Sequence, residues 1–363
     1  MVKKKKIIIK NASNKDLKKI NNFHNHYYRS NRSIKQFLWL FKQSAKSKKF
    51  KDYYFASNGK KIFAILGFIK FNFVLKKRKY LVIKPEDLLL NIDSIKANVF
   101  EKINKKFEKN IKDSNTISIL FNAVGWAFKR INYIPYFGKR VIYIKYHKVN
   151  SLALFLTTKK VPKLLAYFFS FLIIYSLKTF TYCKRLLVKK KVTFKNFKEP
   201  PIWSNSINKS FINYWKFLTV DRNHHFLKWR VFNNPFMKAQ FTAFYYNKVP
   251  VGYLIYNKNM NNLYIVDLII VPPNSTFKVE SMLKEILFYL DDYCIANGIN
   301  YCKFEIYLNN KLNNLLEKSL LNLGYFRKRV DTNFSFKIFN KSINKKTISE
   351  SYLTNINKSG KWH

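Results

Sequence analysis

The stretch NKVPVGYLIYN, residues 247–257, combines a polar turn with an apolar strand that carries a glycine. The same arrangement occurs earlier in the chain as NGKKIFAILGFIKF, residues 58–71. The two glycines, Gly67 and Gly252, are separated by 185 residues (252 − 67 = 185). A pattern that returns at a long, fixed separation indicates two copies of one structural unit.

Further matches follow in the same order along the chain. EDLLLN (86–91) matches VDLIIV (266–271), and ISILFNAV (117–124) matches CKFEIYLNN (302–310). The aligned residues are Asp87 with Asp267, Asn122 with Asn309, Asn132 with Gly324, and Trp39 with Trp229. The separations stay close to that of the glycines; the tryptophans, for example, are 190 residues apart (229 − 39 = 190). Matches in one order at nearly constant separation predict two copies, spanning about 20–150 and 205–340.

Each copy is predicted to contain a helix, a strand hairpin, a third strand, a long helix, a strand, a second helix and a last strand. In the second copy the hairpin turns at Asn247 and Lys248. The third strand, 262–271, is mostly apolar and is expected to be buried on both faces. Apolar residues recur at helical spacing over 278–298, and Gly298 and Gly324 are expected to end the two helices.

The chain is strongly basic, with 69 Lys and Arg against 19 Asp and Glu and a formal charge of +50 over 363 residues. Lys, Asn, Ile, Phe and Tyr have AT-rich codons, so base composition can supply many of these lysines. Such a surface nevertheless attracts phosphate-rich polymers and anionic lipids. A solvated surface and a role at nucleic acid or membrane both remain open. Because no DNA-reading motif accompanies the charge, we expect nucleic acid to bind only non-specifically.

Familiar catalytic motifs are absent from the sequence. The eight glycines form neither a dinucleotide fingerprint nor a P-loop, and there is no H-E-x-x-H or G-x-S-x-G. The three cysteines are spaced for neither a zinc site nor disulfides, so no metal is expected. A reducing cytoplasmic setting fits this usage, with the inner face of the membrane as a peripheral location.

An apolar segment, 151–204, joins the two copies. Its run from Leu164 to Leu177 has 14 residues (177 − 164 + 1 = 14), fewer than the roughly 20 that a spanning helix needs. Lys163, Lys178 and Lys184 bracket the run. Two interpretations stay open for 161–191: a helix packed on the domains, and a basic, aromatic helix lying in an anionic membrane surface. The tail, 341–363, is polar and is expected to lie loosely on the surface.

The order of elements resembles the GNAT acyltransferase fold, and in particular the tandem-GNAT proteins of bacterial surface-polysaccharide and lipid-modifying gene clusters. FLKWRVFNNP (226–235), VGYLIYN (251–257), YIVDLIIV (264–271) and LLNLGYF (320–326) carry the resemblance best. It implies an α/β chain of two GNAT-like modules, each a mixed, mostly antiparallel sheet flanked by helices. The predicted division is a first module at 1–150, a linker at 151–204, a second module at 205–340 and a tail at 341–363.

The resemblance also implies acetyl-CoA or another acyl-CoA between two diverging strands, with its pyrophosphate on the loop before the long helix. That loop is usually rich in glycine, but here it reads VPPNSTFKVE (271–280) and has none. The candidate contacts are therefore Asn274, Ser275, Thr276 and Lys278, with an ordinary loop as the alternative. Asn122 and Asn309 stand where the family often has a cofactor-contacting residue, although helix capping explains them equally well. Where the family often has a proton-donating tyrosine this chain has Leu320 and Phe128, neither of which is an acid.

Asp267, on the third strand, and Glu305, on the strand beside it, are the candidates for a catalytic base. Hydrogen-bonded structural acids are the alternative. Asp221 is expected to cap a short helix that contains Trp229, a core anchor. Arg230 has only Leu40 as its counterpart, and is expected either to brace a carboxylate or to bind substrate. His224 and His225 have no identifiable partner and are expected to begin this helix.

Three functions remain open from the sequence. The first is an N-acyltransferase acting on an amine of a small or lipid-linked acceptor, such as a sugar, lipid or envelope-polymer precursor. The second is a non-catalytic tandem module that scaffolds envelope or polysaccharide assembly. The third is a FemAB-like aminoacyl transferase that uses aminoacyl-tRNA.

Overall fold

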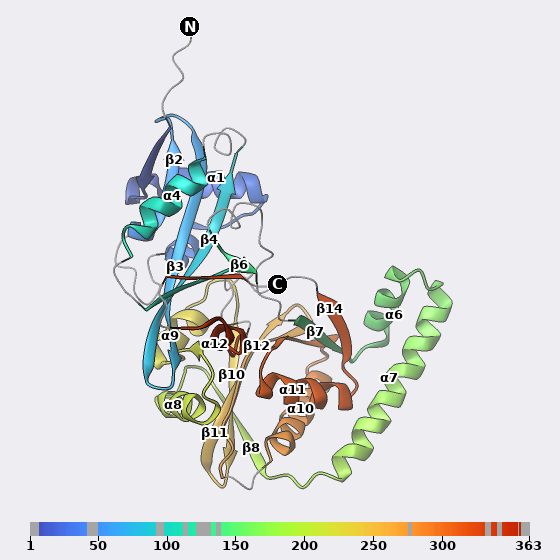
Figure 1. The fold of residues 1–363 in the computed structure, drawn as a ribbon. Coiled ribbons are helices and arrows are strands. Elements are labelled where there is room, and N and C mark those ends of the chain that lie inside the picture. The colour runs from blue at the N-terminus through green and yellow to red at the C-terminus, as the bar shows by residue number, and fades with distance from the viewer. Residues whose placement is uncertain are drawn as a thin grey trace.

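The chain forms two mixed β-sheets that lie one above the other and are flanked by helices (Figure 1). The computed structural model describes residues 7–41, 50–91, 98–111, 115–120, 132–135, 139–274, 278–330, 335–339, 343–354 and 356. The predicted fold class, two mixed and mostly antiparallel sheets with flanking helices, is confirmed.

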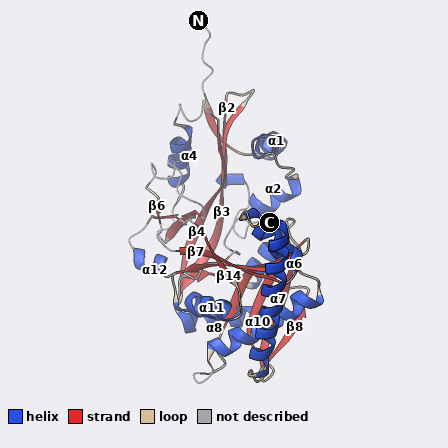
Figure 2. Cartoon of the chain, turned by 90° about the vertical axis from the view of Figure 1, so that its right-hand side faces the viewer, coloured by secondary structure: helices blue, strands red, loops and turns tan. Residues whose placement is uncertain are grey.

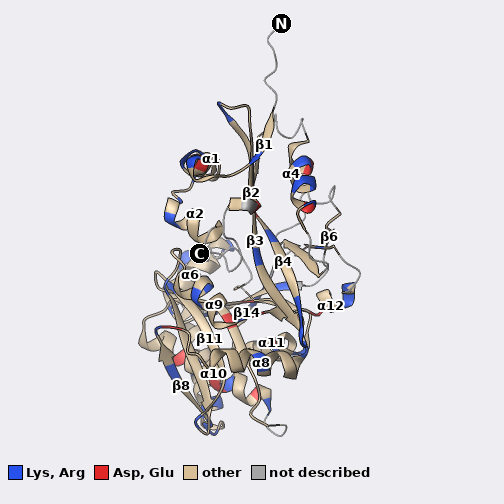
Figure 3. Ribbon diagram, turned by 90° about the vertical axis from the view of Figure 1, so that its left-hand side faces the viewer, with Lys and Arg blue, Asp and Glu red and all other residues tan. Residues whose placement is uncertain are grey.

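The first sheet lies toward the N-terminus, with α1 and α2 on one face and α4 on the other (Figures 2 and 3). Its strand order is β1 (Ile8–Asn11), β2 (Tyr53–Ser57), β3 (Ile62–Leu75), β4 (Arg78–Leu90), β5 (Thr116–Leu120), β15 (Ser335–Ile338) and β6 (Ile134–Pro135), with β9 (Thr219–Val220) paired to β3. Its helices are η1 (Asn14–Asp16), α1 (Leu17–Tyr28), α2 (Ile34–Phe41), η2 (Phe50–Asp52) and α4 (Val99–Glu108).

The second sheet follows the same sequence of hairpin, third strand, helix and fourth strand. Its order is β14 (Phe326–Val330), β7 (Lys139–Tyr146), β13 (Tyr301–Leu308), β12 (Asn262–Ile270), β11 (Val249–Asn259), β10 (Ala239–Tyr246) and β8 (Val192–Phe197). Its helices are α8 (Ser204–Trp215), α9 (His224–Leu227), the π-helical turn η3 (Lys228–Phe232), α10 (Val279–Ala296) and α11 (Lys311–Asn322). Strands β10 to β13 and helices α10 and α11 lie where the sequence predicts them, whereas β8 falls in the predicted linker.

Each sheet takes a strand from the other half of the chain, in addition to the short strand β9 of the second half, which pairs with β3. Strand β7 comes from the first half but pairs with β13 and β14 of the second sheet. Strand β15 comes from the second half but pairs with β5 and β6 of the first. The predicted modules are continuous stretches of the chain, whereas each sheet contains a strand from the other half. Neither half therefore contains a whole sheet.

The two glycines that revealed the repeat are required by close packing. A Cβ on Gly67 would lie 2.4 Å from Cε1 of Phe41, which α2 presses onto β3. A Cβ on Gly252 would lie 2.2 Å from the backbone oxygen of Ile269 on β12. Both distances are far below van der Waals contact. At the predicted hairpin turn, Asn247 and Lys248 have φ of 47° and 65°, the left-handed pair that a two-residue turn needs.

The linker forms a helical hairpin, α6 (Val149–Thr158) and α7 (Lys163–Leu186), at the outer side of the second sheet (Figures 1 and 2). Helix α7 has 24 residues and continues well beyond the apolar run that was counted in the sequence. Within the described residues it is the single helix whose length and composition would suit a membrane crossing, and 22% of its most apolar window is buried.

The prediction of a loose C-terminal tail is wrong for its first half. Helix α12 (Lys345–Ser349) lies where the two sheets meet (Figure 1), and Tyr352, Leu353 and Ile356 are buried. These apolar side chains contribute to the hydrophobic core that both halves share. Burying them provides the driving force that the polar composition of the tail obscured.

Candidate functional site

Each sheet contains one parallel strand pair that separates part-way along its length. In the first sheet β4 and β5 pair only from Leu81 with Thr116 to Ile83 with Ser118. In the second sheet β12 and β13 pair only from Asn262 with Tyr301 to Tyr264 with Lys303. Neither pair continues beyond these residues toward the carboxyl ends of its strands. The place where β4 leaves β5 is called here the first opening, and the place where β12 leaves β13 the second opening. These are the places where the resemblance expects an acyl-CoA.

Asp267 lies in the diverging part of β12, but it is held in a buried ion pair. Arg222 donates to it from Nε at 2.7 Å and from Nη2 at 3.1 Å, and both side chains are fully buried. The hydroxyl of Thr354 donates a third hydrogen bond at 2.7 Å. All three contacts fix the position of the Asp267 carboxylate. The role of Asp267 as a base stays a prediction, and its partners suit an acid that organises the fold.

Glu305 lies on β13 and pairs with Arg140 of the exchanged strand β7, whose Nε is 2.5 Å from its Oε1. This ion pair joins a residue of the first half to one of the second. The predicted neighbourhood of Asp267 and Glu305 on adjacent strands is confirmed, but each carboxylate has its own arginine.

The C-terminal segment, defined here as residues 349–354 with 356, fills the second opening. The hydroxyl of Tyr352 donates to the backbone oxygen of Leu268, in the part of β12 that has left β13. At the end of β13, Asn309 donates from Nδ2 to Ser349 O at 2.9 Å and to Ser351 O at 2.7 Å. The segment is hydrogen-bonded to both strands, at the place where the resemblance expects an acyl-CoA. Asn309 therefore fixes the chain's own segment, and Asn310 caps α11 by accepting from Asn313 N.

The loop before α10 lies at the same end of the second sheet. Asn274 and Lys278 are exposed there, and Lys278 immediately precedes the helix. The candidates Ser275, Thr276 and Asn122, as well as Phe128, lie outside the described residues. Leu320 is fully buried in the core. The nearby backbone oxygen of Ile270 accepts from Trp215 Nε1 at 2.8 Å, so the end of β12 is also satisfied by the chain itself.

The first sheet has its own version of the buried ion pair. Asp87 of β4 is paired with Arg32 and accepts from the hydroxyl of Tyr53 at 3.2 Å. His24 Nε2 lies 3.4 Å from its Oδ1. Asp87 has φ of 57°, at an irregularity in the β3–β4 pairing. The ion pair of Arg32 and Asp87 thus corresponds to that of Arg222 and Asp267. Each pair attaches the helical segment at the start of its half to the third strand of that half.

The first opening differs because it carries a second carboxylate, that of Glu86. Glu86 follows the point at which β4 leaves β5, and its side chain is 11% exposed. The Nζ of Lys84 contacts its Oε2, and the Lys84 side chain is 5% exposed. An ionisable pair at this position, nearly but not completely buried, can reach a ligand in the opening. Glu86 was not among the site residues predicted from the sequence.

Arg230 is buried where the two halves meet. Its guanidinium lies 5.6 Å from the ring centre of Trp39 and 5.4 Å from that of Trp229, and its Nε donates to Ile356 O at 3.0 Å. Burial lowers the pKa of Arg230 to about 10, and the negative charge of Glu86 acts in the opposite direction. Arg230 therefore braces the C-terminal segment, and its role in binding substrate stays a prediction.

Glu86 and Arg230 are charged residues without a charged counterpart in the other half. At the offset of the aspartates, Glu86 corresponds to Val266, and Arg230 corresponds to Leu40. Glu86 could not be predicted from the repeat, because the repeat consists of residues that the two halves share. The signal that could have found it is the pair Glu86–Asp87, in which one carboxylate is repeated and the other is not.

The predicted cap of the short helix is wrong by two residues. Asn223, not Asp221, caps α9, with its Oδ1 accepting from Phe226 N at 2.9 Å. Asp221 instead accepts from Asn208 Nδ2 at 3.0 Å. His224 and His225 begin α9, as the sequence indicates. Among the described residues no group of three His, Cys, Asp or Glu side chains is placed to hold a metal ion.

A groove of about 640 Å³ lies between the tip of the β3–β4 hairpin and helices α8 and α9. Lys76, Lys77, Lys79 and Lys209 line it, with Asp221 as an acidic neighbour. Figure 3 shows Lys and Arg over both halves of the molecule, with Asp and Glu much sparser. Lys79 is seven residues from Glu86 along β4, roughly 23 Å in an extended strand, so this groove is separate from the first opening.

The same arrangement of elements occurs in solved structures with very different sequences. A conserved protein from Enterococcus faecalis matches with a TM-score of 0.58 at 12% identity, over 92% of this chain and 72% of that one. A GCN5-related N-acetyltransferase from Anabaena variabilis gives 0.58 at 10% identity, over 92% and 73%. The fold is that of the GCN5-related N-acetyltransferases.

A third structure, the N-myristoyltransferase of Saccharomyces cerevisiae with bound myristoyl-CoA, matches with a TM-score of 0.55 at 10% identity. That match covers 91% of this chain and 82% of the other. No family model and no curated protein matches the sequence. At these identities the likeness establishes the GNAT fold, and the chemistry has to be argued from the residues of this chain.

Proposed function

We propose that this chain is an N-acyltransferase that uses acetyl-CoA or another acyl-CoA and has its reaction centre at the first opening. The observation that carries the proposal is the position of Glu86. Its carboxylate lies where β4 leaves β5, and its side chain keeps a small exposed fraction. The GNAT fold supports the donor class. When bound, an acyl-CoA would supply the acyl group as an activated thioester.

The proposed roles follow from the positions of the residues. Glu86 accepts the proton of the acceptor amine, directly or through one water. Lys84 holds the Glu86 carboxylate in place, and the negative charge of Glu86 in turn stabilises the buried charge of Arg230. The amine of a sugar, lipid or envelope-polymer precursor is the proposed acceptor class.

The second opening has a different role in this proposal. Tyr352 and Thr354 occupy the backbone and side-chain groups that a ligand would contact there. We therefore assign a single acyl-CoA per chain, held by the first half. Asp267 and Glu305 stay candidate bases, but their pairing with Arg222 and Arg140 supports structural roles.

Titration calorimetry with acetyl-CoA, and then with longer acyl-CoAs, tests the proposal at low ionic strength. The expected result is binding of one acyl-CoA per chain, retained in Asp267→Asn and accompanied by release of free thiol when an acceptor amine is present. Absence of binding for every acyl-CoA would overturn the proposed donor.

A non-catalytic scaffold is the second candidate function, and the occupied second opening favours it. A half whose opening is filled by its own chain keeps the fold without room for a donor. This alternative predicts no acyl-CoA binding and no thiol release, together with capture of an envelope-assembly partner that does not depend on Glu86.

A further inference from the structure

We propose that α7 docks this protein on a bilayer with anionic headgroups and lies in the plane of that surface. The proposal is independent of the acyl-transfer chemistry. Its starting point is the position of the α6–α7 hairpin, which lies at the outer side of the second sheet (Figure 1).

One side of α7, here called the outer face, is apolar and exposed along most of the helix, with the polar Thr179 between Tyr175 and Tyr182. Its residues recur every three or four positions, so they lie on one side of the helix. Leu164, Tyr182 and Leu186 are 85%, 62% and 69% exposed. The members of the outer face are Leu164, Phe168, Phe171, Leu172, Tyr175, Tyr182 and Leu186. A continuous apolar surface of this kind marks an interaction site on a protein.

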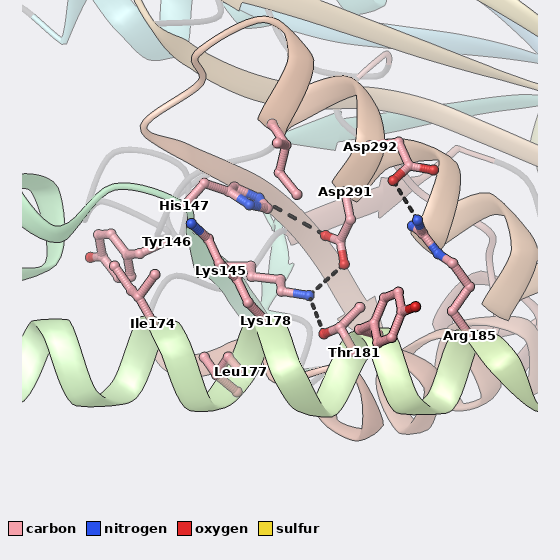
Figure 4. A pocket seen from close by; sticks show the side chains of 12 residues that line it. Lys145, Tyr146, His147, Ile174, Leu177, Lys178, Thr181, Arg185, Asp291 and Asp292 are labelled. Carbon is pink, nitrogen blue, oxygen red and sulfur yellow. Dashed lines mark hydrogen bonds and ion pairs between the residues drawn. The ribbon is translucent and has the colours of Figure 1, made fainter.

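The opposite side of α7 is attached to the second sheet and its helices, which argues against a helix that crosses the membrane. Thr181 accepts from Lys145 Nζ at 3.2 Å, and Lys184 Nζ donates to Asn322 O at 2.7 Å. Arg185 Nη1 lies 2.7 Å from Asp292 Oδ1 on α10, as Figure 4 shows from close by. Crossing a bilayer would break these contacts and bury their charges, whereas lying flat leaves them intact.

The charges around α7 select an anionic lipid surface as the occupant. Between Asp113 and Glu199 the sequence has no acidic residue and 17 Lys or Arg. Lys163 lies at one end of the helix, where a long cationic side chain can reach headgroup phosphates. Phenylalanine and tyrosine on the outer face suit the boundary between headgroups and acyl chains.

A second copy of the chain suits the same face less well. Docking two copies through α7 would bring two sets of these cations together, on chains that each carry a formal charge of +50. The resulting repulsion opposes self-association, whereas the same cations attract an anionic bilayer.

Flotation with vesicles tests the proposal on the full chain. Vesicles of phosphatidylcholine alone are compared with vesicles that also contain phosphatidylglycerol, at about 0.15 M and about 1 M salt. We expect at least tenfold tighter binding to the anionic vesicles at the lower salt. Part of that binding should survive the higher salt, because burial of apolar side chains is not screened.

The outer-face variant Phe168→Gln/Phe171→Gln/Tyr175→Gln is expected to lose tenfold or more in vesicle binding. Its matched control, Ile202→Gln/Val249→Gln/Met260→Gln, replaces exposed apolar residues elsewhere and should bind as the wild type does. Equal binding of both variants, or loss of all binding at the higher salt, would show adsorption by net charge alone and overturn the proposal.

A label on the native Cys183 of α7 gives a readout that needs no outer-face variant. Cys183 is exposed while Cys294 and Cys302 are buried, so an environment-sensitive thiol probe reacts selectively. Its emission should shift to the blue with anionic vesicles and be quenched by spin-labelled lipids. An unshifted label contradicts the proposal. So does a dimer in sedimentation that the outer-face variant converts to monomer without any vesicle binding.

Discussion

Trp39 and Trp229 donate their indole N–H groups to each other's backbone oxygens. Trp39 Nε1 lies 2.8 Å from Trp229 O, and Trp229 Nε1 lies 3.1 Å from Trp39 O. Their ring centroids are 5.9 Å apart. Two residues in equivalent positions that make the same contact with each other define an approximate twofold axis between the halves. The contact therefore joins the two helical entrances directly.

Replacing either tryptophan by phenylalanine should destabilise the fold. Trp39→Phe keeps a ring but leaves a buried carbonyl without its donor, at an expected cost of about 1–3 kcal/mol in the free energy of unfolding. Trp229→Phe should cost about the same, and the double variant should depart from additivity because the rings touch. Urea unfolding followed by circular dichroism measures all three. A matched change at the exposed Tyr214, Tyr214→Phe, should stay within about 0.5 kcal/mol.

Replacing one partner of the buried ion pair of Arg222 and Asp267 should destabilise the fold strongly, whereas replacing both partners should destabilise it much less. Arg222→Met leaves an uncompensated carboxylate in the core and should lower stability by about 3–5 kcal/mol. Arg222→Met/Asp267→Leu removes both charges and should recover most of that loss. A double variant no more stable than the single one would show that Asp267 has no need of a cationic partner.

Stability should fall on acidification because of His147. It lines a pocket of about 290 Å³ beneath α7 with Lys145 and Lys178 (Figure 4). Burial and these two lysines lower the pKa of His147 from 6.5 to about 3. Asp291 Oδ1 lies 3.9 Å from His147 Nε2, but Oδ2 of the same carboxylate pairs more closely with Lys145, at 2.5 Å. Burial therefore has the larger effect on the pKa of His147.

Between pH 6.5 and 3 the unfolded chain therefore binds a proton at His147 that the folded chain does not, and stability falls as the pH falls. The expected loss from this residue is about 2 kcal/mol at pH 5. His147→Gln should remove that part of the slope, while His225→Gln, at an exposed position, should leave it unchanged. Burial raises the pKa of Asp291, which acts in the opposite direction, so the comparison between variants is the informative one. Urea unfolding at several pH values provides the measurement, and identical slopes in the wild type and His147→Gln would contradict it.

The proposed chemistry makes Glu86 and Asp267 separable by kinetics. Glu86→Gln should lower the rate of thiol release from acetyl-CoA, assayed against a panel of amino sugars, by about 10²–10⁴-fold. Its affinity for acetyl-CoA should change little, although its stability should fall because Lys84 loses a carboxylate partner. Asp267→Asn should also be less stable but should have a much smaller effect on turnover. The reverse pattern would move the reaction centre to the second opening.

The strand and helix order could be predicted from the sequence because the two halves repeat it. Gly67 and Gly252 each permit a close approach that a Cβ would prevent, and Asn132 and Gly324 both take left-handed φ, of 64° and 78°. Constraints of this local kind leave a trace in residue type. The exchange of β7 and β15 leaves none, since a strand of either half has the same pattern whichever sheet it joins.

The site was predicted less well, for a physical reason. Asp267 is a central strand carboxylate, but its partners Arg222 and Thr354 lie 45 and 87 residues away and only folding brings them together. Tyr352 was missed because a single aromatic residue among polar neighbours shows neither helical nor strand periodicity. Glu86 was missed because a comparison of the two halves finds the residues that they share. A catalytic residue present in one half only is not found in this way.

The exchanged strand β15 has a consequence for biosynthesis. Strand β5 gains its outer neighbour only when residues 335–338 leave the ribosome, long after β5 itself has been synthesised. Until then the first sheet presents an unpaired edge, which is a hazard for aggregation. Strand β7 likewise waits for β13 and β14. The nascent chain cannot complete one half before starting the other, so we expect a chain shortened before residue 335 to be recovered as aggregate.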